Sequence, residues 1–478
     1  MLDLLTEVLG AVPSRCTYAE ARHVATDEED LLVRNGRVDH IDASASDGIG
    51  VRVRAGGGWG FAATRGSTPA SVERALARAL AIAESQPSAP ARPLAAVVPA
   101  RGHWSCAHEI DPFDVSLEDK LALLFAAEEL LRVDPRIVRS DATCESRRVR
   151  TAFASTEGAA CTQERVECGA SIAATAVDGD ALQVRSHPGS HGSAAACAGW
   201  EHVLGFDLVA NAPRVVAEAL ELLVAPDCPA GRRTVILGGE QLALQIHESI
   251  GHALELDRML LMEASYAGTS WVVPGDLGRL RYGSEQLNIT ADATLPGGLG
   301  TFGWDDEGVA AARTALIEAG RLRAALSDRG SAAAIGLQRS GGCARADGFA
   351  RQPIVRMTNV SIEPGGAGTL ADLVADTDDG LYLETNRSWS IDDRRLHFQF
   401  GTEVAREICG GELGRLLRNP SYAGVTPTFW GGLDAVCSAP AWRLWGVGNC
   451  GKGEPGQVMR VSHGTAPARF RDVQVGVA

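Results

Sequence analysis

The sequence predicts an α+β fold: an N-terminal α/β domain with a mixed or antiparallel sheet and helices, and a C-terminal β-rich domain. Strand-like runs alternate with helical runs through the first half of the chain. Beyond Gly268 the sequence becomes rich in glycine, proline and short strand-forming runs. A chain of 478 residues is long enough for two or three domains. We therefore expect domains at 1–225 and 226–478.

The N-terminal domain is expected to begin with a β-hairpin followed by a helix. Asn35 and Gly36 separate two strand-like runs, which is a typical signal for a two-residue hairpin turn. Thr68 then caps a helix that has Pro69 at its first position. A proline-rich stretch follows, and it predicts a linker at about 86–103 between the two halves of this domain.

A second helix and an antiparallel meander complete the predicted N-terminal domain. The helix begins near Ser116, where Asp119 completes a capping pattern, and it ends before Pro135. A long helical pattern at 206–224 ends the domain, and we expect Pro213 to start or kink that helix. Between the two helices, glycine-containing turns separate strands expected at 147–153, 162–177 and 182–185.

Net charge, apolar runs and cysteine content exclude some classes of binding partner and indicate the cellular compartment. The net charge of -15 argues against binding to nucleic acid or to an anionic membrane, because both favour a basic surface. No run reaches the roughly 18 apolar residues of a membrane span, and the N-terminus lacks the basic start of a secretory signal. The eleven cysteines include no C-x-x-C pair. This pattern is typical of a reduced, cytoplasmic chain.

The segment QIHESIGHALELD carries His247, Glu248 and His252 in the order that a zinc peptidase uses. In the H-E-x-x-H motif the histidines are four residues apart and lie on one face of a helix. Here the second histidine comes one residue later, which places the two side chains about 140° apart around a regular helix. Two independent polar residues would be the simpler interpretation of this spacing alone.

Three features favour a shared metal site despite that spacing. The flanking residues are apolar, so the helix is interior, and burying two histidines and a glutamate is costly unless they share a partner. Gly251 precedes His252, and a residue without Cβ allows irregular backbone geometry. A π-bulge inserts one residue into a helical turn and often occurs at functional sites. The sequence therefore predicts a distorted helix that returns His252 to the face of His247.

A catalytic zinc usually takes three protein ligands, so a third is needed. Glu255 and Asp257 are candidates from the same segment. Cys450 is a distant candidate, because the glycines around it in VGNCGKGEPGQ are typical of a loop that another group approaches closely. Spacing alone leaves these three alternatives open.

The motif HESIGHALELD and the late segment GNCGKGEPGQ closely resemble the TldD/PmbA family of metallopeptidases. The likeness extends over nearly the whole chain, through VRNGRV, GIGVRVRAGGGWGFAAT, WDDEGVAAARTALIEAGRL and RMTNVSIEPG. The resemblance implies His247, His252 and Cys450 as ligands of Zn²⁺, Glu248 as the catalytic glutamate, and a supporting role for Glu255. Because one branch of the family lacks the histidine motif, the intact motif indicates a catalytic, TldD-like subunit.

The resemblance also implies a substrate and a partner. Family members act on unfolded peptides or leader sequences, held extended by pairing with a strand in a chamber between subunits. We therefore expect a dimer, formed either with a second copy or with a homologous TldE/PmbA-like subunit. Two rival functions stay open: a cysteine peptidase with Cys450 as nucleophile, and a non-catalytic peptide-binding or assembly subunit. A chelator separates the first rival from a metallopeptidase, since a thiol enzyme would remain active.

Two further clusters are interpreted as surface turns. His187 and His191 are four residues apart, but Pro188 and Gly189 lie between them, so a surface loop is favoured over a second metal site. The acidic run 305–307 is interpreted as a solvated turn before a helix at 311–320.

Overall fold

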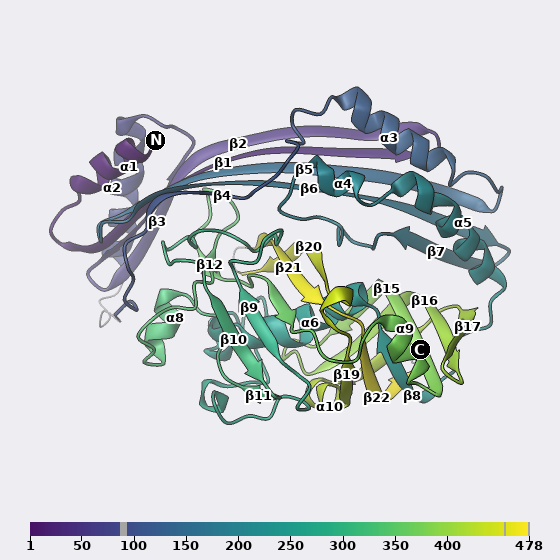
Figure 1. The fold of residues 1–478 in the computed structure, drawn as a ribbon. Coiled ribbons are helices and arrows are strands. Elements are labelled where there is room, and N and C mark those ends of the chain that lie inside the picture. The colour runs from purple at the N-terminus through teal and green to yellow at the C-terminus, as the bar shows by residue number, and fades with distance from the viewer. Residues whose placement is uncertain (87–92, 454–455, 477–478) are drawn as a thin grey trace.

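The computed structural model describes residues 1–86, 93–453 and 456–476. A seven-stranded sheet from the first half of the chain arches over the second half (Figure 1). Its order is β3-β2-β1-β5-β6-β4, and β7 pairs with the end of β6. The strands are β1 (Cys16–Arg34), β2 (Arg37–Ala55), β3 (Gly58–Thr64), β4 (Arg101–Ser105), β5 (Ile137–Ser155), β6 (Ala160–Asp178) and β7 (Ala181–His187).

The predicted hairpin and meander are confirmed. Asn35 and Gly36 turn the chain between β1 and β2 with φ angles of 48° and 76°, the left-handed geometry that this turn requires. The pairs β1–β2, β1–β5, β5–β6 and β6–β7 are all antiparallel. Of the predicted linker, residues 87–92 lie outside the described residues. Its last residues belong to β4, which pairs parallel with β6.

Helices cover the two ends of the arched sheet. α2 begins after Thr68 and α3 after Ser116. As expected of helix caps, the side chain of each residue accepts a hydrogen bond from the backbone N–H three residues later. The last of these helices begins at Leu208, so Pro213 lies inside it and does not start it, and the alternative of a kink at Pro213 stays a prediction. These helices are α1 (Leu2–Gly10), α2 (Pro69–Ser85), α3 (Leu117–Glu129), α4 (Trp200–Leu204) and α5 (Leu208–Val224).

The second half of the chain is built around a closed β-barrel. Strands pair in the order β15-β8-β22-β18-β16, and β16 pairs back onto β15, which closes the ring and leaves no free edge in it. β17 and β19 flank the barrel. The strands are β8 (Gly231–Leu237), β15 (Asp379–Ile391), β16 (His397–Cys409), β17 (Glu412–Leu417), β18 (Ser421–Val425), β19 (Leu433–Val436) and β22 (Ala468–Val475).

Smaller sheets lie beside the barrel. A four-stranded sheet has the order β11-β10-β9-β14, β12 pairs with β13, and β20 and β21 form a two-stranded ribbon. Short helices α8 (Arg329–Ala334), α9 (Leu370–Ala375) and α10 (Thr426–Gly431) connect these parts. The strands are β9 (Ile289–Asp292), β10 (Arg313–Glu318), β11 (Arg321–Leu322), β12 (Ala344–Arg345), β13 (Ile354–Val355), β14 (Val360–Ile362), β20 (Arg443–Lys452) and β21 (Gln457–Thr465). The α+β class with a β-rich second half is thereby confirmed.

The histidine segment occupies the centre of the second half. α6 (Gly239–Ile246) follows β8 and packs on β15, β20 and β21. Ile246, Ile250 and Leu254 are fully buried in the largest apolar cluster of the described residues. Because these strands pack against the helix, they fix its position.

Candidate metal centre and active site

The helix that carries the histidines is distorted where the sequence predicts it. α6 ends at Ile246, residues His247–Gly251 form one π-helical turn, and residues His252–Leu254 form a 3₁₀ turn. The additional residue in the π turn brings the imidazole rings of His247 and His252 to 4.8 Å between centroids. The predicted distortion is therefore confirmed.

The reason for the glycine before His252 differs from the expected one. Gly251 has ordinary right-handed helical angles, φ -53° and ψ -63°. A Cβ at this position would lie 2.0 Å from the sulfur of Met357. Gly251 therefore allows Met357 to pack directly against the helix backbone, and the π turn does not depend on an unusual glycine conformation.

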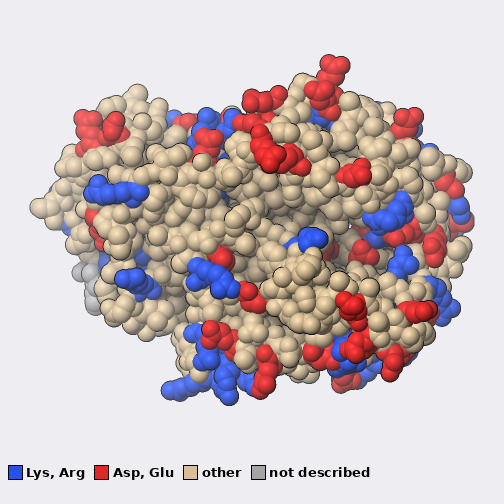
Figure 2. All heavy atoms as spheres, viewed as in Figure 1, with Lys and Arg blue, Asp and Glu red and all other residues tan. Residues whose placement is uncertain are grey.

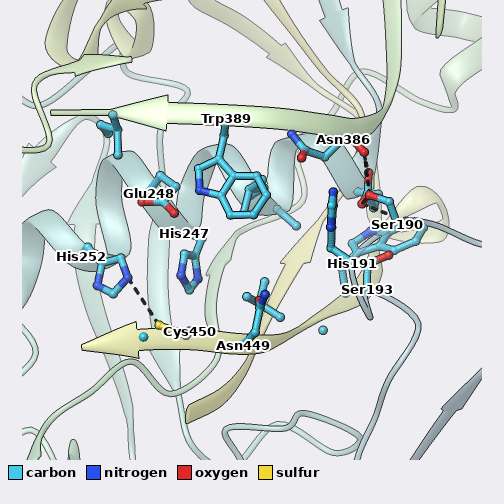
Figure 3. A pocket seen from close by; sticks show the side chains of 18 of the residues that line it. Ser190, His191, Ser193, His247, Glu248, His252, Asn386, Trp389, Asn449 and Cys450 are labelled. Atoms are coloured by element: carbon cyan, nitrogen blue, oxygen red, sulfur yellow. Dashed lines mark hydrogen bonds between the residues drawn. The ribbon is translucent and has the colours of Figure 1, made fainter. Parts of the chain in front are cut away.

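Cys450 completes a cluster of three ligand-type side chains. It lies on β20, at an irregularity in the pairing with β21, and its Sγ is 3.4 Å from Nε2 of His252. The ligand atoms of His247, His252 and Cys450 all lie within 4.8 Å of one another, and all three side chains are buried. Figure 3 shows the three side chains pointing toward one another, with Glu248 beside them.

The other two candidates for a third ligand are occupied elsewhere. Glu255 accepts from Nδ1 of His252 at 2.9 Å and from Nε of Arg258 at 2.8 Å. Asp257 accepts two hydrogen bonds of 2.8 Å from the Nζ of Lys452. The geometry thus assembles Cys450 with the histidines and leaves Glu255 behind His252, while the roles that the family resemblance implies for these residues stay a prediction.

A charged carboxylate fixes the orientation of the His252 ring. Burial raises the pKa of Glu255, but Lys452, His252 and Arg258 more than offset this, so its pKa lies well below the ordinary value. The ionised carboxylate can only accept, so Nδ1 of His252 donates to it and Nε2 keeps its lone pair on the side of Cys450.

A neutral relay orients His247, and sequence analysis missed it. His463 on β21 contacts the carbonyl oxygen of Val360 through Nδ1 at 2.7 Å, and Nδ1 of His247 through Nε2 at 2.8 Å. A carbonyl only accepts, so Nδ1 of His463 is the donor and its Nε2 is the acceptor. His247 therefore donates from Nδ1, which leaves its Nε2 unprotonated and free to bind a metal.

Burial keeps the imidazoles of the cluster neutral. It lowers the pKa of His247 and of His252 to about 4, and that of His463 well below its ordinary value. The Cys450 thiol differs: burial raises its pKa, but the positive charge of Arg356 and the contact with His252 bring it below the ordinary value. Neutral imidazoles and a thiol that ionises readily are the forms that bind metal ions.

Glu248 forms an ion pair at the edge of the cluster. Its Oε2 accepts from Nη1 of Arg395, which comes from the turn between β15 and β16. Both residues line a pocket of about 390 Å³ that also exposes His247, His252 and Cys450. The carboxylate is thus held beside the three ligand-type side chains.

The pocket has two strand segments as walls. Residues 389–391 of β15 form one wall and residues 445–447 of β20 form the other, while α6 lies beneath them. Trp389 projects from β15 into this space (Figure 3). Two roughly facing strand segments beside a metal-type cluster suit a substrate with an extended backbone.

The loop after β7 also contributes to the pocket. His191 lies exposed on a turn, as expected, and from there it lines the pocket and packs edge-on against Trp389 with 5.4 Å between ring centroids. Neighbouring Ser190 donates to the buried carboxylate of Glu240 on α6. Burial raises the pKa of Glu240 to about 7. The N-terminal sheet therefore delivers residues to a pocket formed mainly by the second half of the chain.

The acidic run before residue 311 corrects one sequence interpretation. Asp305 is buried and its carboxylate accepts from the backbone N–H groups of Glu307, Val309 and Ala344. The expected helix after it is a strand, β10, because pairing with β9 and β11 buries Leu316. Asp305 therefore holds the surrounding backbone in place through these hydrogen bonds, and the run is not a solvated turn.

The face of the molecule in Figure 2 carries interspersed acidic and basic side chains and shows no continuous basic surface. This agrees with the net charge of -15. In the described part of the chain, no helix is both long and apolar enough to cross a membrane.

Comparison with known proteins identifies the family. Models of the PmbA/TldA metallopeptidase match in three parts: domain 1 over residues 19–83, the central domain over 110–225, and the C-terminal domain over 230–477. The chain belongs to the TldD/PmbA family. The resemblance noted in the sequence is thereby confirmed.

Individual relatives agree with this assignment. A protein named metalloprotease from Methanothermobacter thermautotrophicus is 28% identical over 99% of this chain and 98% of its own length. A zinc metalloprotease TldD homolog from Saccharolobus solfataricus is 28% identical over 52% of each chain. The crystal structure of TldE from Thermococcus kodakarensis has the same fold, with a TM-score of 0.76, 15% identity and 99% of both chains covered. The chain is therefore a member of a metallopeptidase family.

Proposed function

We propose that the protein is a zinc-dependent peptidase in which His247, His252 and Cys450 hold the metal and Glu248 is the general base. One observation carries the proposal: the three ligand atoms converge within 4.8 Å in a pocket that Glu248 also lines. Two imidazoles and a thiolate are ligands that suit zinc, and three protein ligands leave a position open for chemistry. Both histidines present an unprotonated Nε2 for this purpose.

The chemistry follows from the residues of the pocket. A bound zinc ion would polarise the peptide carbonyl and lower the pKa of water at the site. Glu248 accepts a proton from the attacking water and passes it to the amine that leaves. The walls at 389–391 and 445–447 hold the substrate extended, so backbone groups rather than one particular side chain are recognised.

The proposed substrates are unfolded peptides or leader sequences, and the proposed assembly is a dimer. The fold shared with TldE supports a partnership with a homologous TldE/PmbA-like subunit, and a second copy of the chain is the alternative. A reduced cytoplasmic location suits the eleven cysteines, which are all free thiols in the structure.

Glu248→Gln tests the assignment of the base. The amide keeps the size of the side chain but cannot take a proton, so we expect zinc content to be retained and turnover of unfolded peptides to fall by about 10²-fold or more. The measurement is cleavage of a mixed peptide pool, followed by mass spectrometry, with the zinc-loaded parent as the reference. Normal hydrolysis by the variant would contradict the role of Glu248.

The same assay separates the rival cysteine peptidase. Removal of zinc with a chelator should abolish cleavage, and added zinc should restore it. Activity that survives metal removal would assign the reaction to the Cys450 thiol instead.

A further inference from the structure

Arg395 occupies a turn whose backbone is held from several sides. It lies between β15 and β16 with φ 61°, a left-handed conformation that is uncommon for a residue with a side chain. Its N–H donates to the carbonyl of Asp392 at 2.9 Å, and its own carbonyl accepts from the hydroxyl of Thr426 at 2.8 Å. The next N–H, of Leu396, donates to the carboxylate of Asp392 at 2.7 Å. The turn holds the Arg395 side chain in one direction.

A separate segment of chain fixes the tip of the same turn. The carbonyls of Asp393 and Arg394 accept from the backbone N–H groups of Thr269 and Trp271 at 2.9 and 2.8 Å. Strain at an uncommon φ persists only where the surroundings determine it, and such positions cluster at functional sites. The side chains on this turn differ in direction: Arg394 is exposed, whereas Arg395 lines the pocket.

The Arg395 guanidinium has donors that the protein does not use. Nη1 donates to Glu248, whereas Nη2 makes no hydrogen bond to the described residues and is not among the buried polar atoms. Nε is buried within the turn and out of reach of a ligand. Since Arg395 lines the pocket beside Glu248, a bound substrate can supply an acceptor for Nη2.

Charge balance indicates the kind of acceptor. Glu248 already neutralises Arg395, so the pair has no net charge and gives a free carboxylate little electrostatic advantage over water. A peptide carbonyl is neutral when it binds and gains negative charge only as water attacks it. Donors that are fixed in advance stabilise that late charge, because they need not reorganise during the reaction.

We propose that Arg395 is a further catalytic residue, which holds the Glu248 carboxylate and donates a hydrogen bond to the substrate carbonyl oxygen. The inference rests on the proposed peptidase function. As the water oxygen bonds to the carbonyl carbon, its proton passes to Glu248 and the carbonyl π pair moves onto the oxygen that Arg395 contacts. When the C–N bond breaks, the electron pair returns from that oxygen and the proton moves from Glu248 to the amine. Arg395 keeps its own protons throughout.

Arg395→Ala tests the proposal on zinc-loaded protein. We expect kcat for peptide cleavage to fall about 10²- to 10³-fold, as for removal of one donor to a developing oxyanion. Zinc per chain should equal that of the parent. Added guanidinium chloride at low, non-denaturing concentration should restore part of the rate in this variant and leave the parent unchanged. Arg394→Ala is the matched control, because it changes a neighbouring arginine that is exposed, and its rate should equal that of the parent.

Calorimetric binding gives a readout that does not depend on turnover. The probe is an alanine tetrapeptide whose central peptide bond is replaced by a phosphinic group, which resembles the attacked carbonyl. Arg395→Ala should bind it about 10²-fold more weakly than the parent, and should bind uncleaved tetraalanine with nearly parental affinity.

Each other outcome overturns the proposal in a recognisable way. A parental kcat and parental phosphinate affinity in Arg395→Ala would remove Arg395 from the reaction while leaving the peptidase function intact. Loss of zinc in the variant would make Arg395 a structural residue of the metal site. A parent protein that neither cleaves peptides nor binds the phosphinate would overturn the peptidase function together with this inference.

Discussion

His252 and His247 present their rings to the same cysteine, but they are supported from behind in different ways. His252 is backed by the charged Glu255, which Arg258 and Lys452 neutralise. His247 is backed by the neutral His463, which ends on a backbone carbonyl. Both arrangements place the proton on Nδ1 and leave Nε2 free. A charged and a neutral partner can therefore select the same tautomer. The loss of stability should differ, however, between removal of the charged partner and removal of the neutral one.

Removing Glu255, the charged support of His252, should have the largest effect on stability. In Glu255→Gln, Arg258 and Lys452 lose a buried carboxylate, and breaking a buried ion pair typically costs about 3–5 kcal/mol. We expect the free energy of unfolding to fall by about 3 kcal/mol or more, and zinc affinity to fall about 10- to 100-fold. Urea denaturation and competition with a chromophoric chelator measure the two effects.

A matched control keeps this test specific. Glu407→Gln removes a carboxylate that pairs with an exposed arginine, Arg415, so it should change neither quantity measurably. Equal effects of the two substitutions would contradict a special role for Glu255.

Removing the neutral support should have a smaller effect on stability, because no charge is left unpaired. In His463→Ala the Nδ1–H of His247 loses its acceptor, and we expect zinc affinity to fall about 10- to 100-fold. His463→Gln keeps an amide oxygen that can accept, so it should recover part of the loss. If His463→Ala binds zinc as tightly as the parent, the relay does not orient His247. Chelator competition makes the measurement.

The imidazoles and Glu255 should lose their contributions to stability in different pH ranges. In the unfolded chain a histidine takes up a proton at a pKa of about 6.5, whereas His247 and His252 in the folded, metal-free protein stay neutral down to about 4. Between these values the unfolded state binds more protons. The contribution of these imidazoles to stability should therefore fall as the pH falls from about 6.5 to about 4, by about 1.4 kcal/mol per pH unit for each imidazole.

Glu255 should contribute nothing to that acid loss. Its pKa is depressed, so its stabilisation is complete above the unfolded value of about 4.3 and is lost only as the pH falls toward the folded value below it. Buried carboxyls such as Glu240, whose pKa burial raises to about 7, change stability in the opposite direction over this range. Urea denaturation between pH 4 and 7 therefore compares the chelator-treated parent with a variant that carries both His247→Gln and His252→Gln. Identical pH slopes of the two proteins would contradict neutral, buried imidazoles.

Local sequence patterns predicted one side of the site. The single extra residue between His247 and His252 required a π turn, because only an inserted residue restores a shared face. The hairpin at Asn35 and Gly36 and the helix caps at Thr68 and Ser116 were likewise predictable, since each depends on residues within one turn of chain.

Residues that depend on distant pairing were not predictable in the same way. His463 is 216 residues from His247 and reaches it only because β21 packs on α6. Arg395 belongs to no recognisable sequence motif. The direction of its side chain is set by a turn that other segments of the chain hold in place. Cys450 had only its glycine neighbours and the family resemblance to indicate it. Closure of the barrel joins β15 to β16 and required three-dimensional pairing that periodicity does not contain.

Zinc content per chain tests the central claim most directly. Elemental analysis would compare the parent with Cys450→Ala, both purified without a chelator or a metal-affinity tag. We expect close to one zinc per chain in the parent and a large loss in the variant, because the thiolate is one of three protein ligands. Zinc retained fully by Cys450→Ala, or no metal in the parent, would contradict the proposed site.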